Sequence, residues 1–223
     1  MLGTAHLLQA YNHYWRNSTF IYFSTDEVFG PAKKQDKFHE WERYNSTNPY
    51  AATKAGAEEL CLAFANTYNL DIRITHCMNV FGEYQHPEKF IPLCIKRIQN
   101  REVINIHADE TKKIPGSRFY IHAKKVAEAV DFILQHGTSR QKYNIVGDEE
   151  IDNLTLAEKI SSILEIPGRF NLVDFHSSRP GHDLRYALSG QLLRTMGFSF
   201  STTFDQDLET TVKWFQANPE WLT

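Results

Sequence analysis

A hydroxyl and two adjacent carboxylates follow directly on an apolar run early in this chain. The segment FIYFSTDEVFG, residues 20–30, places Thr25, Asp26 and Glu27 between a strand-like run and a glycine. Carboxylates beside an apolar run are costly to bury unless they are paired or used in chemistry. Because open α/β sheets bind ligands at the carboxyl ends of their strands, the two carboxylates are a candidate acid and base. Solvated side chains of a surface turn are the alternative.

A tyrosine and a lysine four positions apart form a second candidate pair. Tyr50 and Lys54 would share one face of a helix, where the ammonium can lower the pKa of the phenol. A free tyrosine titrates near pH ~10, so a phenolate at neutral pH needs a shift of about three units, roughly 4 kcal/mol. The spacing alone is weak evidence, because Tyr120 and Lys124 repeat it across an expected strand-to-helix junction.

The composition is that of an ordinary soluble globular protein. The 223 residues are 42% hydrophobic and carry a formal net charge of −3, which gives no basic footprint for nucleic acid. Cys61, Cys77 and Cys94 lack the spacing of a metal site and are expected to be buried free thiols. No apolar run has membrane-spanning length and no secretory signal is visible, so we expect a cytoplasmic protein without a membrane partner.

Strands alternate with helices along the chain, which predicts a mostly parallel sheet covered on both faces. The expected strands cover 20–24, 71–82, 103–107 and 142–147. The expected helices cover 4–16, 46–68, 87–100, 123–137, 153–166 and 205–217. Ser46, Thr47 and Asn48 are cap candidates for the second helix, and Thr155 with Glu158 stands in capping-box register at the fifth.

Several segments arrive in an order that resembles the extended short-chain dehydrogenase/reductase family, which includes the NAD-dependent epimerases and dehydratases. They are STDEVFG, NPYAATKA, MNVFGEYQHPEKFIP, SRPGHDLRYAL and NPEW. Within the family, the chain is most similar to the nucleoside-diphosphoglucose 4,6-dehydratases, the group that contains the dTDP-glucose enzymes. The resemblance extends from residue 2 to residue 221, and the triplet TDE and the run RPGHD are its specific parts.

This resemblance implies NAD as cofactor and dTDP- or UDP-glucose as substrate, dehydrated to the 4-keto-6-deoxy sugar through transient reduction of NAD. Tyr50 would take the proton of the C4 hydroxyl, Lys54 would tune the tyrosine and bind ribose, and Thr25 would hold O4. Asp26 would be the acid that protonates the departing C6 hydroxyl, and Glu27 the base that removes the hydrogen on C5. The residues implied to contact the cofactor are Ser24, Tyr50 and Lys54.

The resemblance also implies a set of residues that grip the nucleotide-sugar. They are Asn79, Lys89, Arg118, Asn153, Arg179, His182 and Asp183. Arginines suit a diphosphate because a guanidinium group binds phosphate oxygens bidentately. Asn153 could equally be a helix N-cap. His76, where relatives often carry arginine, is interpreted as an ordinary strand residue.

The implied fold is α/β, a Rossmann-like parallel sheet lacking its first βα units, with a smaller interleaved α/β lobe that binds the sugar nucleotide. The glycine-rich G-x-x-G-x-x-G turn that holds the pyrophosphate of NAD in the family is absent from the 223 residues. We therefore expect an N-terminally truncated chain that is inactive in this form. We assign 1–79 to the remaining half of the NAD-binding domain and 80–223 mainly to the substrate lobe. Residues 118–150 and about 180–200 would return to the NAD-binding domain.

Other interpretations stay open at this stage. A nucleotide-sugar 4-epimerase or decarboxylase belongs to the same superfamily, but neither needs the adjacent Asp26 and Glu27. A non-catalytic remnant that binds nucleotide-sugar or a partner is favoured by the absent glycine-rich turn. We expect the complete enzyme to be a homodimer through the helices near 2–16 and 50–68, as family members are. The residues do not distinguish a thymidine from a uridine nucleotide.

Overall fold

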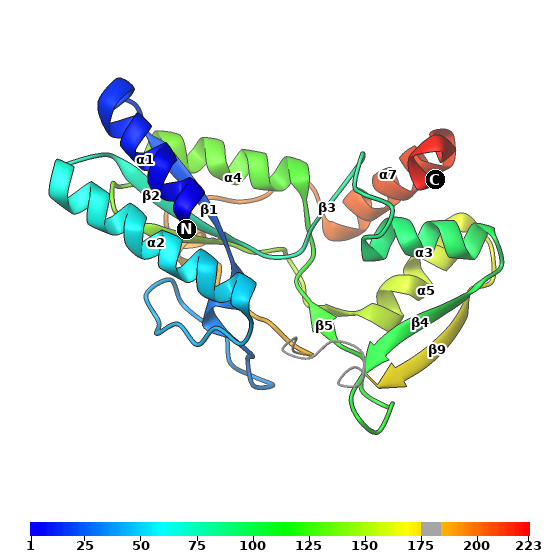
Figure 1. The fold of residues 1–223 in the computed structure, drawn as a ribbon. Coiled ribbons are helices and arrows are strands. Elements are labelled where there is room, and N and C mark those ends of the chain that lie inside the picture. The colour runs from blue at the N-terminus through cyan, green and yellow to red at the C-terminus, as the bar shows by residue number, and fades with distance from the viewer. Residues whose placement is uncertain (175–183) are drawn as a thin grey trace. The chain divides into compact units, whose positions relative to one another are not determined.

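The computed structural model describes residues 1–174 and 184–223, and the chain divides into two compact units (Figure 1). The first unit contains Met1–Met78, Val126–Val146 and Tyr186–Ser199, and the second contains Asn79–Lys125, Gly147–Arg185 and Phe200–Thr223. Residues 118–125 and 147–150, which the sequence assigned to the NAD-binding domain, lie in the second unit. Each unit is thus built from segments that are far apart in the sequence.

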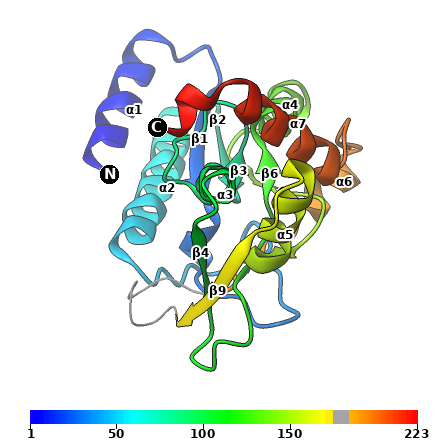
Figure 2. The same ribbon diagram turned by 90° about the vertical axis from the view of Figure 1, so that its right-hand side faces the viewer.

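A parallel sheet forms the centre of the first unit. Strands β1 (Phe20–Thr25), β2 (Ile72–Cys77) and β7 (Lys142–Ile145) lie in the order β1-β2-β7, and both neighbouring pairs are parallel. The register sets Ser24 beside His76 near the carboxyl ends of β1 and β2. Figure 2 shows α1 and α2 to one side of these two strands and α4 to the other. The fold class expected from the sequence is confirmed in this unit.

Helix α2 (Pro49–Tyr68) is the longest helix of the described residues and has defined signals at both ends. Its N-cap is Asn48, whose Oδ1 accepts the backbone N–H of Ala51 at 2.8 Å, and Pro49 fits the first turn because it has no N–H to satisfy. The helix ends at Asn69 in the left-handed conformation, with φ of 51°.

Three more helices belong wholly or mainly to the first unit: α1 (Leu2–Tyr14), α4 (Ala123–His136) and α6 (Gln191–Thr195). One face of α2 packs with α1 against the sheet, and the buried core there is apolar. The core residues of this cluster are Leu8, Tyr11, Cys61, Ala65, Leu70, Ile72 and Ile74. Their burial fixes the position of α2 on β1 and β2.

The second unit contains strand pairs and a three-helix layer. Its pairs are β3 (Val80–Phe81) with β6 (Ile121–His122), β4 (Val103–Ala108) with β9 (Arg169–Asp174), both parallel, and β5 (Ser117–Arg118) with β8 (Ile151–Asp152), antiparallel. Its helices are α3 (Phe90–Gln99), α5 (Asn153–Leu164) and α7 (Phe204–Ala217), followed by the short 3₁₀ helix η2 (Pro219–Leu222). Isoleucines of α3 and β4 and apolar residues of α5 and α7 form its core.

The structure departs from the sequence-based elements at three points. The strand expected over 71–82 is two strands, β2 and β3, which belong to different units. The cap of α5 is Asp152, whose Oδ1 accepts the backbone N–H groups of Leu154 and Thr155, so the expected capping box at Thr155 is wrong. Strand β9 was not expected, because it has no fully buried residue to give it a core pattern.

The cysteine prediction is confirmed for two of the three thiols. All three cysteines are free; Cys61 and Cys94 are buried, whereas Cys77 is half-buried. Burial raises the pKa of each thiol to about 12. None of the helices in residues 1–174 and 184–223 has the length and apolar content that crossing a membrane requires.

Candidate active site

The carboxyl end of β1 turns at once into the 3₁₀ helix η1 (Asp26–Phe29). Thr25 caps this helix: its Oγ1 accepts the backbone N–H of Glu27 at 3.4 Å and donates to Asp26 Oδ1 at 3.0 Å. Gly30 ends the turn with φ of +75°, and a Cβ there would lie 2.4 Å from the carbonyl oxygen of Asn45. Asp26 is only 6% exposed, which a solvated surface turn does not explain.

The second carboxylate is held by the cap of α2. Asn48 Nδ2 donates to Glu27 Oε2 at 2.7 Å while the Oδ1 atom of the same amide caps the helix. Glu27 is half-buried, so it keeps access to solvent while one of its oxygens is fixed. Asn48 was considered in the sequence only as a cap, and no sequence signal marks its contact with Glu27.

One face of α2 meets the end of β1. Tyr50 and Lys54 lie four residues apart on that face, as the spacing predicts. Lys54 Nζ donates to the carbonyl oxygen of Phe23 at 2.6 Å and lies 4.9 Å from the centre of the Tyr22 ring. An interaction of the Tyr50 phenol with the Thr25 side chain lowers the pKa of Tyr50. The structure therefore brings the predicted catalytic residues, from Thr25 to Lys54, together within the first unit.

The electrostatics of Tyr50 differ from those that a base needs. Burial raises the pKa of Tyr50 above its usual value, the Glu27 carboxylate raises it further, and the hydrogen bond with Thr25 opposes both. The Lys54 ammonium is bound to the Phe23 carbonyl oxygen. Tuning of Tyr50 by Lys54 in the isolated chain therefore stays a prediction.

The predicted nucleotide-sugar residues that the structure describes all belong to the second unit. Asn79 and Lys89 are exposed. Arg118 Nη1 donates to the backbone oxygens of Ser117 at 2.7 Å and Leu184 at 2.5 Å. Asn153 is the first residue of α5, where its Oδ1 accepts the Tyr120 hydroxyl at 2.8 Å, so the N-cap alternative is wrong. Arg179, His182 and Asp183 lie outside the described residues.

A buried polar cluster next to the candidate site was missed by the sequence analysis. We call it the Glu58 cluster, and its members are Ser24, Tyr44, Glu58, His76 and Lys142. Glu58 continues the four-residue spacing of Tyr50 and Lys54 along α2, which is the signal that could have identified it. His76 lies in β2 as expected, but its ring is fully buried and bonded, so it is more than an ordinary strand residue.

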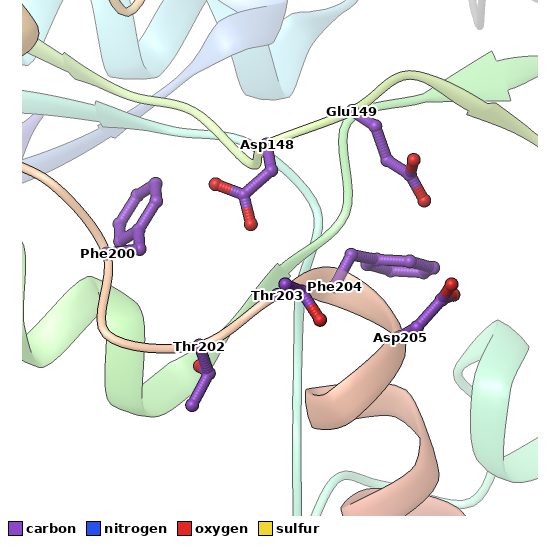
Figure 3. Close-up of a pocket in the computed structure, with 7 residues that line it drawn as sticks. All are labelled: Asp148, Glu149, Phe200, Thr202, Thr203, Phe204 and Asp205. Carbon is purple, nitrogen blue, oxygen red and sulfur yellow. The ribbon is translucent and has the colours of Figure 1, made fainter.

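A separate depression of about 410 Å³ lies in the second unit, at the start of α7 (Figure 3). Its lining consists of Asp148, Glu149, Phe200, Thr202, Thr203, Phe204 and Asp205. Asp148 is paired with Lys125 at 2.5 Å and Asp205 with Lys159 at 2.6 Å, so two of its carboxylates are already compensated. In the described part of the chain, no group of three or more His, Cys, Asp or Glu side chains is arranged to hold a metal ion.

Comparison with known proteins identifies relatives of this chain. The chain matches the model of the NAD dependent epimerase/dehydratase family over residues 1–146. It is 32% identical over 238 residues to a dTDP-glucose 4,6-dehydratase of Xanthomonas campestris, covering 100% of this chain and 67% of the relative. It is 36% identical over 221 residues to a trifunctional UDP-glucose 4,6-dehydratase/UDP-4-keto-6-deoxy-D-glucose 3,5-epimerase/UDP-4-keto-L-rhamnose-reductase of Arabidopsis thaliana, covering 98% of this chain.

Solved structures agree with these relatives. A dTDP-glucose 4,6-dehydratase of Bacillus anthracis in complex with NAD superposes with a TM-score of 0.89 at 31% identity, covering 99% of this chain and 68% of that one. A UDP-glucose 4-epimerase of Thermus thermophilus in complex with NAD gives a TM-score of 0.85 at 23% identity, which is a likeness of fold alone.

The share of each relative that is matched differs between the plant and bacterial proteins. The chain spans 32% of the Arabidopsis relative and 67% of the Xanthomonas relative. It spans 63% of a dTDP-glucose 4,6-dehydratase of Streptomyces niveus, to which it is 34% identical. The Rossmann-like α/β fold and the family match extend over most of the chain. The chain therefore belongs to the NAD dependent epimerase/dehydratase family.

Proposed function

We propose that this chain is the catalytic part of an NAD-dependent lyase that dehydrates a nucleoside-diphosphate glucose to its 4-keto-6-deoxy product. The observation that carries the proposal is the pair Asp26 and Glu27, one carboxyl buried and the other half-buried and bonded to Asn48, beside the Tyr50 hydroxyl. Relatives with 30% identity or more that bear the name dTDP-glucose 4,6-dehydratase support it.

The arrangement suits elimination of water across two adjacent carbons. Such a reaction needs a proton acceptor at C5 and a proton donor at the C6 hydroxyl, and adjacent carboxyl groups supply one of each when their environments differ. Asp26, buried and bonded to Thr25, is the donor in this proposal, and Glu27 is the acceptor. Tyr50, in its phenolate form, would accept the proton of the C4 hydroxyl, and its interaction with Thr25 favours that form by lowering the pKa of Tyr50.

The residues present fit one half of NAD. Tyr50 and Lys54 project from one helix face beside the end of β1, and they would hold the nicotinamide riboside there. Ser24 donates its hydroxyl hydrogen to Glu58, so it has only acceptor capacity left for the cofactor. The 223 residues contain no glycine-rich turn for the pyrophosphate. When bound, NAD supplies the acceptor for the hydride that leaves C4.

The nucleotide-sugar would be bound by the second group of predicted residues, Asn79, Lys89, Arg118, Asn153, Arg179, His182 and Asp183. The Arg118 guanidinium donates to two backbone oxygens in this structure. The phosphate oxygens of a diphosphate would bind the same group more strongly, because they can accept two of its hydrogen bonds side by side. We propose either dTDP-glucose or UDP-glucose as substrate, since relatives named for each nucleotide share more than 30% identity with the chain.

We also propose that the protein is a cytoplasmic homodimer. Helix α1 and the residue that follows it expose four large apolar side chains, Leu2, Leu7, Tyr14 and Trp15. Exposed apolar surface of this kind marks a protein interface, and a second copy of the chain could cover it. The three free thiols suit a reducing compartment, and the net charge of −3 gives nucleic acid no basic surface to bind.

The test is product analysis in heavy water, on a protein in which the glycine-rich βα units of a dehydratase relative precede these 223 residues. We call this the extended protein. From a nucleoside-diphosphate glucose, it should release a product lighter by one water and carrying one solvent deuteron at C5. A product of unchanged composition would replace the proposal with a 4-epimerase. Absence of any turnover, despite binding of both ligands, would favour a non-catalytic binding protein.

A further inference from the structure

The Glu58 cluster places ionisable groups between α2 and the sheet, and the pair at its centre, Glu58 and His76, is fully buried. The side chains of Glu58 and His76 are both 0% exposed, and Lys142 in β7 is 4% exposed. Glu58 accepts hydrogen bonds from Ser24 in β1 and from the Tyr44 hydroxyl. A buried carboxylate with this many donors is expensive to assemble and needs its positive partners to remain charged.

The hydrogen bonds of Asn144 fix the protonation of the His76 ring. Asn144 Nδ2 donates to the backbone oxygens of Phe38 at 3.0 Å and Ser189 at 3.1 Å, so both of its hydrogens are used. Its Oδ1, an acceptor, lies 2.9 Å from His76 Nδ1. The Nδ1 atom of His76 must therefore carry a hydrogen.

The other ring nitrogen faces an acceptor too. His76 Nε2 lies 3.1 Å from Glu58 Oε2, and two bare lone pairs would repel at that distance. A proton must lie between them. Burial raises the pKa of Glu58, but the hydrogen bond and charge of His76, with the bonds from Ser24 and Tyr44, outweigh burial and hold that pKa below its usual value. Lys142 Nζ lies 3.4 Å from the same Glu58 oxygen, and the Ser24 and Tyr44 hydroxyls donate to Glu58, so the contacts favour a carboxylate and leave the proton on the His76 ring.

Three residues of α2, one on each successive turn, contact the end of β1, and the Glu58–His76 pair is at the third of these contacts. Tyr50 interacts with Thr25, Lys54 donates to the carbonyl oxygen of Phe23, and Glu58 accepts the Ser24 hydroxyl. The three helix residues share one face at intervals of four. The first two links are exposed or half-buried, whereas the third is buried and charged.

We propose that Glu58 is a positioning residue. Through a proton that it shares with His76, it holds α2, the helix that carries Tyr50 and Lys54, in place relative to the two carboxylates that follow β1. The effect on catalysis rests on the proposed dehydratase function, whereas the proton shared by Glu58 and His76 does not depend on that function. Without a proton between His76 Nε2 and Glu58 Oε2, two lone pairs would face each other at 3.1 Å, so the link between α2 and β2 depends on that proton.

Other ionisable groups surround the pair from each element packed against it. Lys142 Nζ from β7 lies 3.4 Å from Glu58 Oε2 and donates to the Tyr44 hydroxyl, and Tyr44 comes from the loop after η1. Glu40 accepts the backbone N–H of Asn144 at 3.3 Å, and Cys61 lies one turn along α2. Burial, followed by Glu58, raises the pKa of Cys61 to about 12, so this thiol adds no charge to the cluster at neutral pH.

The first test needs no enzymatic activity and uses the 223-residue chain. Nitrogen NMR of the histidine rings should show His76 with both nitrogens protonated at pH 7.5. In Glu58→Gln, the amide NH₂ can donate to Nε2 and the amide oxygen can still accept from Ser24, so His76 should become a neutral ring in a folded chain. His76→Asn assigns the signal. A neutral His76 ring in the wild type would overturn the shared proton.

The second test uses the extended protein and separates positioning from stability. Glu58→Gln should lower kcat roughly 10- to 100-fold with little change in KM, because misplaced catalytic groups slow the reaction without removing substrate contacts. The matched control is Glu59→Gln, an exposed glutamate one residue along the same helix, which should behave as the wild type.

The two tests fail independently. If the wild-type extended protein does not dehydrate its substrate although His76 is an imidazolium, the proposed function is wrong and the proton assignment stands. If the wild type dehydrates and Glu58→Gln has the same kcat and KM, the positioning role is wrong. A fall in thermal stability alone, with kcat unchanged, would likewise reduce Glu58 to a structural residue and overturn the proposal.

Discussion

The amide group of Asn48 connects the start of α2 to the Glu27 carboxylate. Its nitrogen donates to Glu27 Oε2 at 2.7 Å, and its oxygen accepts the backbone N–H of Ala51 at 2.8 Å. One side chain therefore aligns the helix that carries Tyr50 with the carboxylate proposed as the base. An amide does both from its two ends, because its nitrogen donates while its oxygen accepts.

Replacing Asn48 should separate these two tasks. Serine caps a helix about as well as asparagine, so Asn48→Ser should change the free energy of unfolding by less than about 0.5 kcal/mol, whereas Asn48→Ala should cost about 1 kcal/mol. Asn48→Ser should still slow C5 hydrogen exchange in the extended protein about tenfold, the equivalent of ~1.4 kcal/mol. Urea unfolding and deuterium uptake measure the two effects. Unchanged deuterium uptake would show that Glu27 does not need the amide.

The two adjacent carboxylates should have different roles in the partial reactions. Asp26→Asn should leave oxidation at C4 largely intact but slow the loss of water by roughly 10²- to 10⁴-fold, the usual worth of a positioned general acid. Glu27→Gln should instead block exchange of the C5 hydrogen with solvent. Single-turnover absorbance of reduced NAD and mass spectrometry of the products in heavy water separate these steps. Loss of C4 oxidation in both variants would contradict the assignment.

The titration of Tyr50 should respond in opposite directions to its two neighbours. Burial and the Glu27 charge raise the pKa of Tyr50, and the bond with Thr25 lowers it. The phenol should therefore remain protonated beyond its ordinary range in the chain. Glu27→Gln should lower the pKa of Tyr50 and Thr25→Val should raise it. Carbon NMR of labelled tyrosine follows both, with Tyr50→Phe to assign the signal; shifts of the same sign would refute this account.

The 223-residue chain should bind NAD weakly. Without a glycine-rich turn, the pyrophosphate lacks the backbone N–H groups that usually hold it, and Tyr50 and Lys54 reach only the nicotinamide riboside. Calorimetry should detect little binding to the chain and clear stoichiometric binding to the extended protein. Tight binding to the 223 residues would mean that another segment supplies the pyrophosphate contacts.

The proposed dimer predicts that a charge on α1 should separate the subunits. Leu7 is 62% exposed, and Leu7→Glu in the extended protein should shift sedimentation from dimer to monomer. Leu134→Glu on α4, another exposed leucine, is the matched control and should leave the dimer intact. A wild-type protein that sediments only as a monomer would exclude the interface.

The sequence predicted those parts of the molecule whose residues carry their own local signal. The alternation of strands and helices, the cap candidate Asn48 and the four-residue spacing of Tyr50 and Lys54 depend on neighbours in the chain, and each is found in the structure. Thr25, Asp26 and Glu27 were likewise marked by their place after an apolar run. The meeting of these residues with Tyr50 follows from the packing of α2 on β1.

Other features depend on partners distant in the sequence and could not be predicted in this way. His76 acquires its role from Glu58 and Asn144, which lie 18 and 68 positions away. Strand β9 is ordered by backbone pairing with β4, so its own side chains show little pattern. The cap of α5 was misplaced because Asp152, Asn153 and Thr155 are all residue types that favour caps, and only the backbone geometry selects Asp152.

The position of β1 at the end of the order β1-β2-β7 has a consequence for handling the isolated chain. Within the described residues, only one side of β1 is hydrogen-bonded to another strand, and the exposed Phe23 lies on this strand. An open edge of this kind is a template for strand addition, either by a further strand of the same fold or by another molecule. The purified 223 residues should therefore aggregate through β1 as their concentration rises, and a strand supplied in the extended protein should suppress that aggregation.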